Sequence, residues 1–144
     1  MSAFVEKPPY WINRAAFLFR AELARAFADA GIDVTPEEWA LQMVLYERTA
    51  LSVGDLAELT LRDRTTVTRF VDTLVRKGLA TRRPDPKDRR RMLIALSPRG
   101  RERFPDMLAH AGELIARSTA GIEPAEIETM MSVLQRMIRN IAGG

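Results

Sequence analysis

Residues 56–100 of this 144-residue chain read LAELTLRDRTTVTRFVDTLVRKGLATRRPDPKDRRRMLIALSPRG, and they decide the fold. Ser52 precedes this stretch and is followed three residues later by Asp55, a pattern typical of a helix N-terminus. Asp63 can cap a second helix, and Gly78 supplies a stop for it. The sequence therefore predicts two short consecutive helices, the first ending near residue 59 and the second near residue 77.

A basic hairpin is predicted directly after the second helix. Residues 79–83 (LATRR) and 91–97 (RMLIALS) favour strands, and the turn PDPKD lies between them. The two prolines stiffen this turn, and the aspartate between them favours it. Two helices followed by such a hairpin form a winged helix-turn-helix. In that arrangement the second helix fits the DNA major groove, and the first braces it across the backbone.

Helical spacing of apolar residues continues on both sides of this core. Residues 11–30 predict one helix, and Thr35 is a suitable N-cap for a helix that follows it. Beyond the hairpin, residues 97–120 and 123–141 predict two longer helices, which Gly121 separates. The expected fold class is mainly α with a small β-hairpin wing: a winged helix-turn-helix plus a helical region.

Positive charge is concentrated in the winged segment. Residues 62–103 contain 14 lysines and arginines against 5 acidic residues, a net charge of +9, while the rest of the chain has a net charge of −6. Of the 22 basic residues, 19 are arginine, whose planar fork suits phosphates and base edges. This distribution indicates a nucleic-acid partner for the segment.

Several function classes are disfavoured by composition. The chain has no cysteine and a single histidine, His110, so neither a thiolate metal site nor a histidine-based catalytic triad is expected. No paired carboxylates or glycine-rich phosphate loop stand out, and no secretion signal or membrane-spanning run is apparent. We therefore expect a cytoplasmic protein that is not an enzyme and carries no metal or cofactor.

Residues 56–100 resemble the MarR family of bacterial transcription regulators. The resemblance rests on TVTRFVDTLVRKGLATR, on the DRR of the wing tip and on the LSPRG that starts the next helix. It extends over nearly the whole chain in the number and order of helices, with one departure at Leu61, where many relatives have a glycine. It implies a homodimer on double-stranded DNA, with residues 35–97 forming the DNA-binding domain, and with 1–34 and 98–144 forming a helical dimerisation region.

The predicted DNA-binding residues come from the second helix and the wing. Threonine can bond a phosphate or contact a thymine methyl, and arginine can grip guanine or phosphate. In the wing, the resemblance places Arg90 in the minor groove, with Asp88 holding it. The predicted set comprises Arg62, Arg64, Thr65, Thr66, Thr68, Arg69, Lys87, Asp88, Arg89 and Arg90.

The resemblance also implies a small-molecule effector. Family members often bind small aromatic or phenolic anions between the dimer helices and the DNA-binding lobe, and a release of DNA on binding would make the protein a ligand-controlled repressor. Residues that could line such a cleft are Trp11, Phe17, Trp39, Met43 and His110; packing in the core is the alternative for each. The alternative function is a non-specific architectural DNA-binding protein without an effector.

Overall fold

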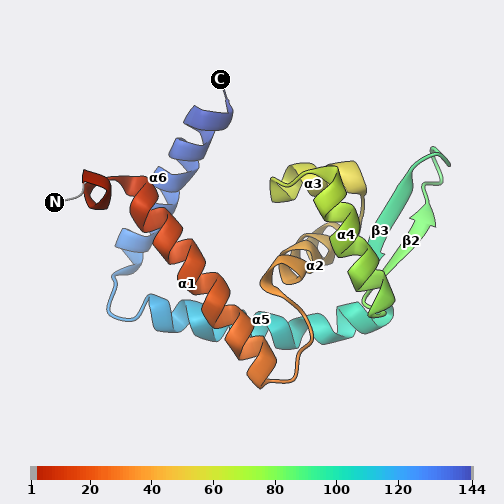
Figure 1. Ribbon diagram of the computed structural model, residues 1–144, viewed down its shortest axis with the longest axis horizontal. Helices are drawn as coiled ribbons and strands as arrows, with labels where there is room; N and C mark the ends of the chain where they lie inside the picture. The colour runs from red at the N-terminus through yellow and green to blue at the C-terminus, as the bar shows by residue number, and fades with distance from the viewer. Residues whose placement is uncertain (1–2, 144) are drawn as a thin grey trace. The chain divides into compact units, whose positions relative to one another are not determined.

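The computed structural model describes residues 3–143 and places them in two compact units, one through Ala111 and one from Gly112 onward. The first unit begins with a 3₁₀ turn, η1 (Ala3–Glu6), and helix α1 (Pro8–Asp29). Helix α5 (Pro98–Ser118) runs from the first unit into the second, which also contains α6 (Pro124–Ala142). Figure 1 follows these elements along the chain.

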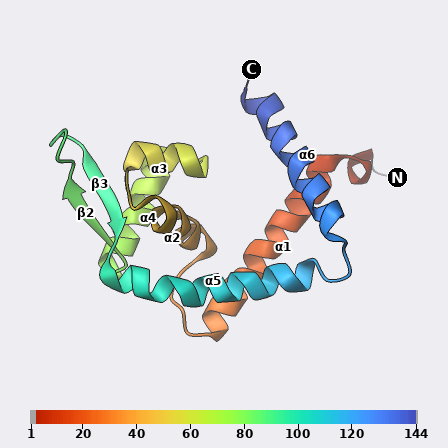
Figure 2. The same cartoon turned by 180° about the vertical axis from the view of Figure 1, so that it is seen from behind.

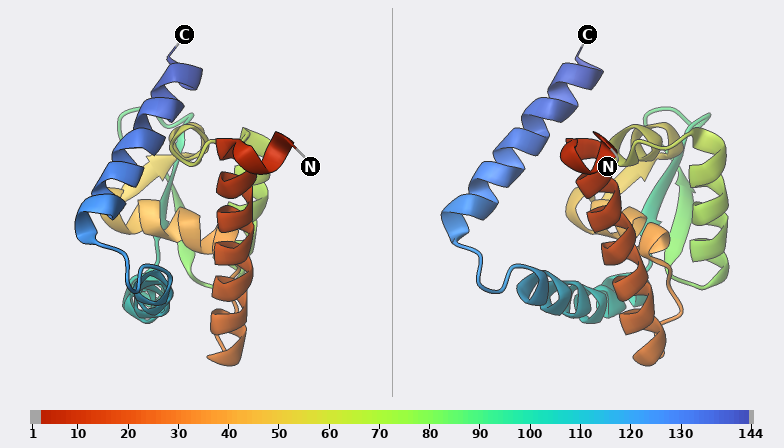
Figure 3. Two further views of the ribbon diagram at one scale, coloured as in Figure 1. Left: turned by 90° about the vertical axis from the view of Figure 1, so that its left-hand side faces the viewer. Right: turned by 60° about the vertical axis from the view of Figure 1, so that its left-hand side comes forward.

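The winged helix-turn-helix lies entirely in the first unit. Its elements are α2 (Pro36–Arg48), β1 (Ala50–Ser52), α3 (Val53–Thr60), α4 (Arg64–Arg76), β2 (Ala80–Pro84) and β3 (Met92–Leu96). The strands form an antiparallel sheet in the order β1-β3-β2. Figure 2 shows the β2–β3 hairpin projecting past the helices as a wing, and Figure 3 shows α4 alongside the sheet.

The predicted caps form at three helix starts. The side chains of Thr35, Ser52 and Asp63 each accept a hydrogen bond from the backbone N–H three residues later. Because each cap satisfies a donor that the helix leaves open, α2, α3 and α4 begin where the sequence predicted. Helix α1 begins at Pro8, three residues earlier than expected.

Two features of the turn region were not predicted. Strand β1 adds a third strand beside β3, pairing Leu51 with Ile94, and at three residues it is too short to show a periodicity. Leu61, between α3 and α4, has a left-handed conformation with φ of 54° and ψ of 41°. Glycine adopts this conformation without steric cost, which explains physically why a glycine would suit that position.

The core of the first unit is built from every helix around the sheet. Helix α4 contributes a completely buried face, and α2 and α3 pack against it. Phe27 of α1 and Phe104 of α5 pack on Trp39 of α2. The completely or almost completely buried side chains are Phe27, Leu41, Gln42, Leu45, Leu56, Val67, Val71, Leu74, Ile94, Phe104 and Met107.

The start of α5 is fixed to the turn that follows α4. Ser97 donates its hydroxyl to the carbonyl of Gly78 at 2.6 Å and accepts from the N–H of Gly100 at 3.0 Å. A Cβ on Gly100 would lie 2.1 Å from the carbonyl oxygen of Leu79. The LSPRG segment is therefore a close-packed joint, and a side chain on Gly100 would not fit it.

Candidate nucleic-acid interface

The N-terminus of α4 is held by Asp63 and Thr66. One carboxylate oxygen of Asp63 accepts from the N–H of Thr66, and the other accepts from its hydroxyl, both at 2.8 Å. These two hydrogen bonds, the backbone one first, lower the pKa of Asp63 below its ordinary value of 3.8. The Thr66 hydroxyl therefore serves the cap, which the sequence did not reveal.

The remaining polar residues of α4 form an outward face. Thr65, Thr68 and Arg69 are exposed on the helix, while Val67 and Val71 on the opposite side are completely buried. Because side chains three and four positions apart lie on one helical face, Thr65, Thr68 and Arg69 are close neighbours. This face carries donors and acceptors, and the one acidic residue near it, Asp72, is paired with Arg82, so the face suits contact with DNA.

Arg62 and Arg64 lie against the protein at the base of α4. The guanidinium carbon of Arg62 is 5.6 Å from the ring centre of Phe70, within the range of a cation–π contact. The guanidinium of Arg64 covers the backbone of Gly54 in α3, where an added Cβ would be 2.7 Å from its Nη2 atom. Both residues remain exposed, so each contacts the fold and also faces solvent.

The wing tip is a compact turn built around two aspartates. The N–H of Lys87 donates to the Asp85 carboxylate at 2.9 Å, and the N–H of Asp85 donates to the carbonyl of Arg91 at 2.8 Å. Arg90 donates to Asp88 from its backbone N–H and from Nε, both at 3.1 Å. The Arg90 side chain, then its backbone N–H, lowers the pKa of Asp88.

These contacts leave the Arg90 side chain exposed to solvent but restrict its conformations. Its side chain is 91% exposed while its Nε is paired with Asp88. An arginine that is already ordered loses less conformational freedom when it enters a groove. Lys87 and Arg89 are also exposed at the tip, where Arg89 lies beside Pro84 and Pro86.

Ion pairs connect the elements of this interface. Arg91, just before β3, pairs with Asp55 of α3 at 3.4 Å, and Arg82 of β2 pairs with Asp72 of α4. No local pattern predicted these pairs, because the partners are 36 and 10 residues apart. They connect the wing to both helices of the helix-turn-helix and so fix the wing relative to α3 and α4.

A third ion pair lies at the far end of α4. Nζ of Lys77 is 3.0 Å from the carboxylate of Glu38 and 3.5 Å from that of Asp33. The Glu38 side chain is only 5% exposed. A buried carboxylate needs a partner to offset its desolvation, so Lys77 and Glu38 together fix the end of α4 on α2.

The five predicted effector residues lie in two places. Trp39 and His110 both contact the ring of Phe27, with ring centres 6.4 Å apart in each case. Trp11 and Phe17 are exposed on α1, where Trp11 donates from its ring N–H to the carbonyl of Val5 at 2.8 Å. The fifth residue, Met43, is half-buried on α2, one turn beyond Trp39.

The rings of Phe27, Trp39, Tyr46, Phe104 and His110 form an aromatic cluster, and polar atoms without partners lie within and beside it. Trp39 Nε1 and both amide atoms of Gln42 are buried and accept or donate no hydrogen bond to any described residue. Gln42 is completely buried, one turn before Tyr46, whose ring stacks on that of Phe104 at 4.5 Å. Buried polar groups are normally satisfied, so these three atoms are exceptions in this core.

Residues 3–143 contain neither a metal-binding cluster nor a membrane-spanning helix. In that range no group of three or more histidine, cysteine, aspartate or glutamate side chains is arranged to hold a metal ion. Within the same range, none of the helices combines the length and the apolar character needed to cross a membrane.

Comparison with known proteins finds a matching family and similar structures. The sequence pattern of the MarR family matches residues 34–92. A crystal structure of a probable transcriptional regulator from Pseudomonas aeruginosa is 30% identical and superimposes with a TM-score of 0.82, covering 93% of this chain and 98% of the other. BpsR of Bordetella bronchiseptica, whose DNA binding is regulated by 6-hydroxynicotinic acid, is 26% identical with a TM-score of 0.84, covering 95% and 96%.

A relative of known regulatory direction is also similar. The transcriptional repressor IacR of Pseudomonas putida is 22% identical over 134 residues, which make up 93% of this chain and 79% of that protein. The family match covers the helix-turn-helix and the wing, and the relatives extend the likeness over the flanking helices. This chain belongs to the MarR family, and it is a transcription regulator rather than an enzyme.

Proposed function

We propose that the protein binds a palindromic operator as a homodimer and represses transcription in the cytoplasm. One observation carries this proposal: two basic surfaces, the Thr65–Arg69 face of α4 and the Arg90 wing tip, are both exposed. The ion pair between Arg91 and Asp55 connects the wing to the helix-turn-helix. The first would read the major groove and the second the adjacent minor groove, where arginine is attracted to narrow A·T-rich sequence.

We assign the DNA-binding role to the residues predicted from the sequence, with Thr66 acting mainly through the cap. In the domain division that follows, residues 35–97 bind DNA, and residues 1–34 and 98–144 form the dimer. Exposed apolar side chains on the terminal helices support this division, since exposed apolar surface of this extent is typical of interfaces. They include Trp11, Phe17 and Leu18 on α1 and Met130, Met131 and Ile138 on α6.

A small aromatic acid is proposed as the effector. Trp39 and His110 offer aromatic surfaces, and the unpartnered Nε1 of Trp39 and amide of Gln42 offer hydrogen bonds to a carboxylate or hydroxyl. The regulation of BpsR by 6-hydroxynicotinic acid supports this ligand class. The ligand would release DNA only if it binds the non-DNA conformation more tightly than the DNA-bound one.

Selection of bound sequences from a random DNA pool tests the operator. A twofold dimer predicts an imperfect palindrome with half-site centres about 10 bp apart. The alternative, an architectural protein without an effector, predicts that random DNA competes almost equally with any selected sequence. A specific regulator predicts a preference of about 10³-fold or more.

Calorimetry with a panel of aromatic acids tests the effector. We expect heat of binding from at least one acid and weaker operator binding in its presence, both reduced by Gln42→Leu. If no acid in a broad panel binds or alters DNA affinity, the cluster around Trp39 is only packing and the effector proposal is wrong.

A further inference from the structure

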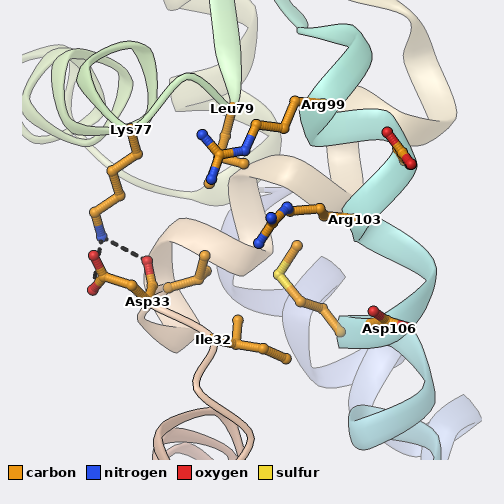
Figure 4. Close-up of a pocket in the computed structure, with 10 residues that line it drawn as sticks. Ile32, Asp33, Lys77, Leu79, Arg99, Arg103 and Asp106 are labelled. Atoms are coloured by element: carbon orange, nitrogen blue, oxygen red, sulfur yellow. Dashed lines mark hydrogen bonds and ion pairs between the residues drawn. The ribbon is translucent and has the colours of Figure 1, made fainter.

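We propose that a second pocket, separate from the aromatic cluster, binds a small aliphatic monocarboxylate. The pocket has a volume of about 720 Å³ and lies within the first unit. It is enclosed by the segment after α1, the end of α4 and the first turns of α5 (Figure 4). Its volume lies within the range of sites that bind small organic molecules.

The floor of the pocket is aliphatic. Val34, Leu79 and Met107 line it and are each less than 10% exposed, and Ile32 adjoins them. None of the described residues that line it is aromatic. An aliphatic chain would therefore cover this floor, whereas a bare inorganic anion would leave it in contact with water.

Two arginines supply the anion-binding groups. Arg99 and Arg103 are four residues apart on α5, and so lie one above the other on the same helical face. In Figure 4 both side chains extend from α5 toward the side of the pocket where Leu79 and Lys77 lie. In the described chain, neither guanidinium is within ion-pair distance of a carboxylate. A carboxylate would accept charge-assisted hydrogen bonds from them.

The acidic residues of the rim limit the charge of the ligand. Glu102 and Asp106 also line the pocket, and Asp33 does so while paired with Lys77. These three carboxylates would repel a dianion more strongly than a monoanion. For a single carboxylate placed between the arginines, attraction to the two guanidinium groups would exceed this repulsion. A monocarboxylate with an apolar tail matches both the charges and the floor.

Occupation of the pocket would affect α4 through Lys77, a consequence that rests on the proposed DNA-binding function. Lys77 is the C-cap residue that follows α4, and its Nζ donates to the carbonyl of Asp33 at 2.9 Å. A bound carboxylate competes with Asp33 for this ammonium group. The orientation of α4 is thereby linked to the pocket, and ligand binding lowers operator affinity.

Calorimetry on the full chain with butanoate, hexanoate and octanoate tests the site. We expect affinity to rise with chain length, by up to about fourfold for each methylene that becomes buried. Octan-1-ol, which lacks the charge, and inorganic phosphate, which lacks the tail, should bind much more weakly. Arg99→Gln and Arg103→Gln should each weaken octanoate binding by about tenfold or more.

Arg101→Gln is the matched control, because Arg101 lies on the same helix but points to the ring of Tyr46 at 5.1 Å. It should leave octanoate affinity unchanged. The proposal is overturned if affinity is independent of chain length, if phosphate binds as well as octanoate, or if Arg101→Gln weakens binding as much as Arg103→Gln.

Operator titration with and without octanoate then measures the link to α4. Calorimetry tests ligand binding in the pocket without operator DNA. A protein that binds octanoate but no operator would refute only the DNA-binding proposal.

Discussion

At the scale of single residues, Asp88 and Arg90 form the wing-tip pair for which we propose a role in DNA binding. Asp88 accepts from both the backbone and the side chain of Arg90 and leaves the guanidinium exposed. A fixed, solvent-facing arginine suits a narrow minor groove, whose negative potential is strongest in A·T-rich sequence.

Replacing Arg90 by alanine tests this role. We expect Arg90→Ala to weaken operator binding, with a larger loss for A·T-rich flanks than for G·C-rich flanks, while the fold and the dimer remain intact. Fluorescence anisotropy on operators that differ only in the flank measures the difference. If the variant binds every operator as tightly as the parent, the wing is only a charged loop.

Asp63 makes the start of α4 sensitive to acid. Its folded pKa is lowered, so its charge stabilises the folded state above pH 3.8 and this contribution disappears as pH falls through the lowered value. Asp63→Asn keeps a capping side chain but removes the charge. We expect the free energy of unfolding of the parent to exceed that of Asp63→Asn at neutral pH, and this difference to close as the pH falls below about 4. Urea unfolding of both proteins at neutral and at acidic pH measures the difference. A pH-independent gap would contradict the assignment.

At the scale of elements, two glycines in α5 have opposite roles. A Cβ at Gly100 would collide with the backbone of Leu79, whereas a Cβ at Gly112 would have no atom within 4 Å. We expect Gly100→Ala to destabilise the fold by about 1–3 kcal/mol. We expect Gly112→Ala to stabilise it by about 0.5–1 kcal/mol, since alanine is the better helix former. Thermal unfolding of both variants checks the pair; equal effects would mean that α5 is not joined tightly to the turn after α4.

Elements with local signals were predictable, and those that depend on distant partners were not. Asp63, Ser52 and Thr35 marked three helix starts because a cap acts within three residues. Strand β1 exists because β3 offers an edge, so no pattern within Ala50–Ser52 revealed it. Likewise, the sequence indicated the exposed face of α4 but not the pairing of Lys77 with Glu38, because the two residues meet only after α2 and α4 pack together.

At the scale of the whole molecule, the terminal helices carry the prediction of a dimer. Helix α6 contains no buried residue, although its apolar side chains recur at helical spacing. We expect removal of residues 123–144 to abolish the soluble dimer, because the apolar partner surface would be lost. Light scattering at several concentrations measures the mass. A truncated chain that remains a folded dimer would refute this division.

The central claim, sequence-specific recognition by α4, is tested most directly by competition binding with Arg69→Ala. The parent should prefer the selected operator over random DNA by about 10³-fold or more, and its affinity should fall with salt, with a slope of about −0.9 for each phosphate neutralised. Arg69→Ala should lose about 1–3 kcal/mol on the operator and relax the preference at one position in each half-site. Equal binding of operator and random DNA by the parent, or an unchanged base preference in Arg69→Ala, would contradict the account.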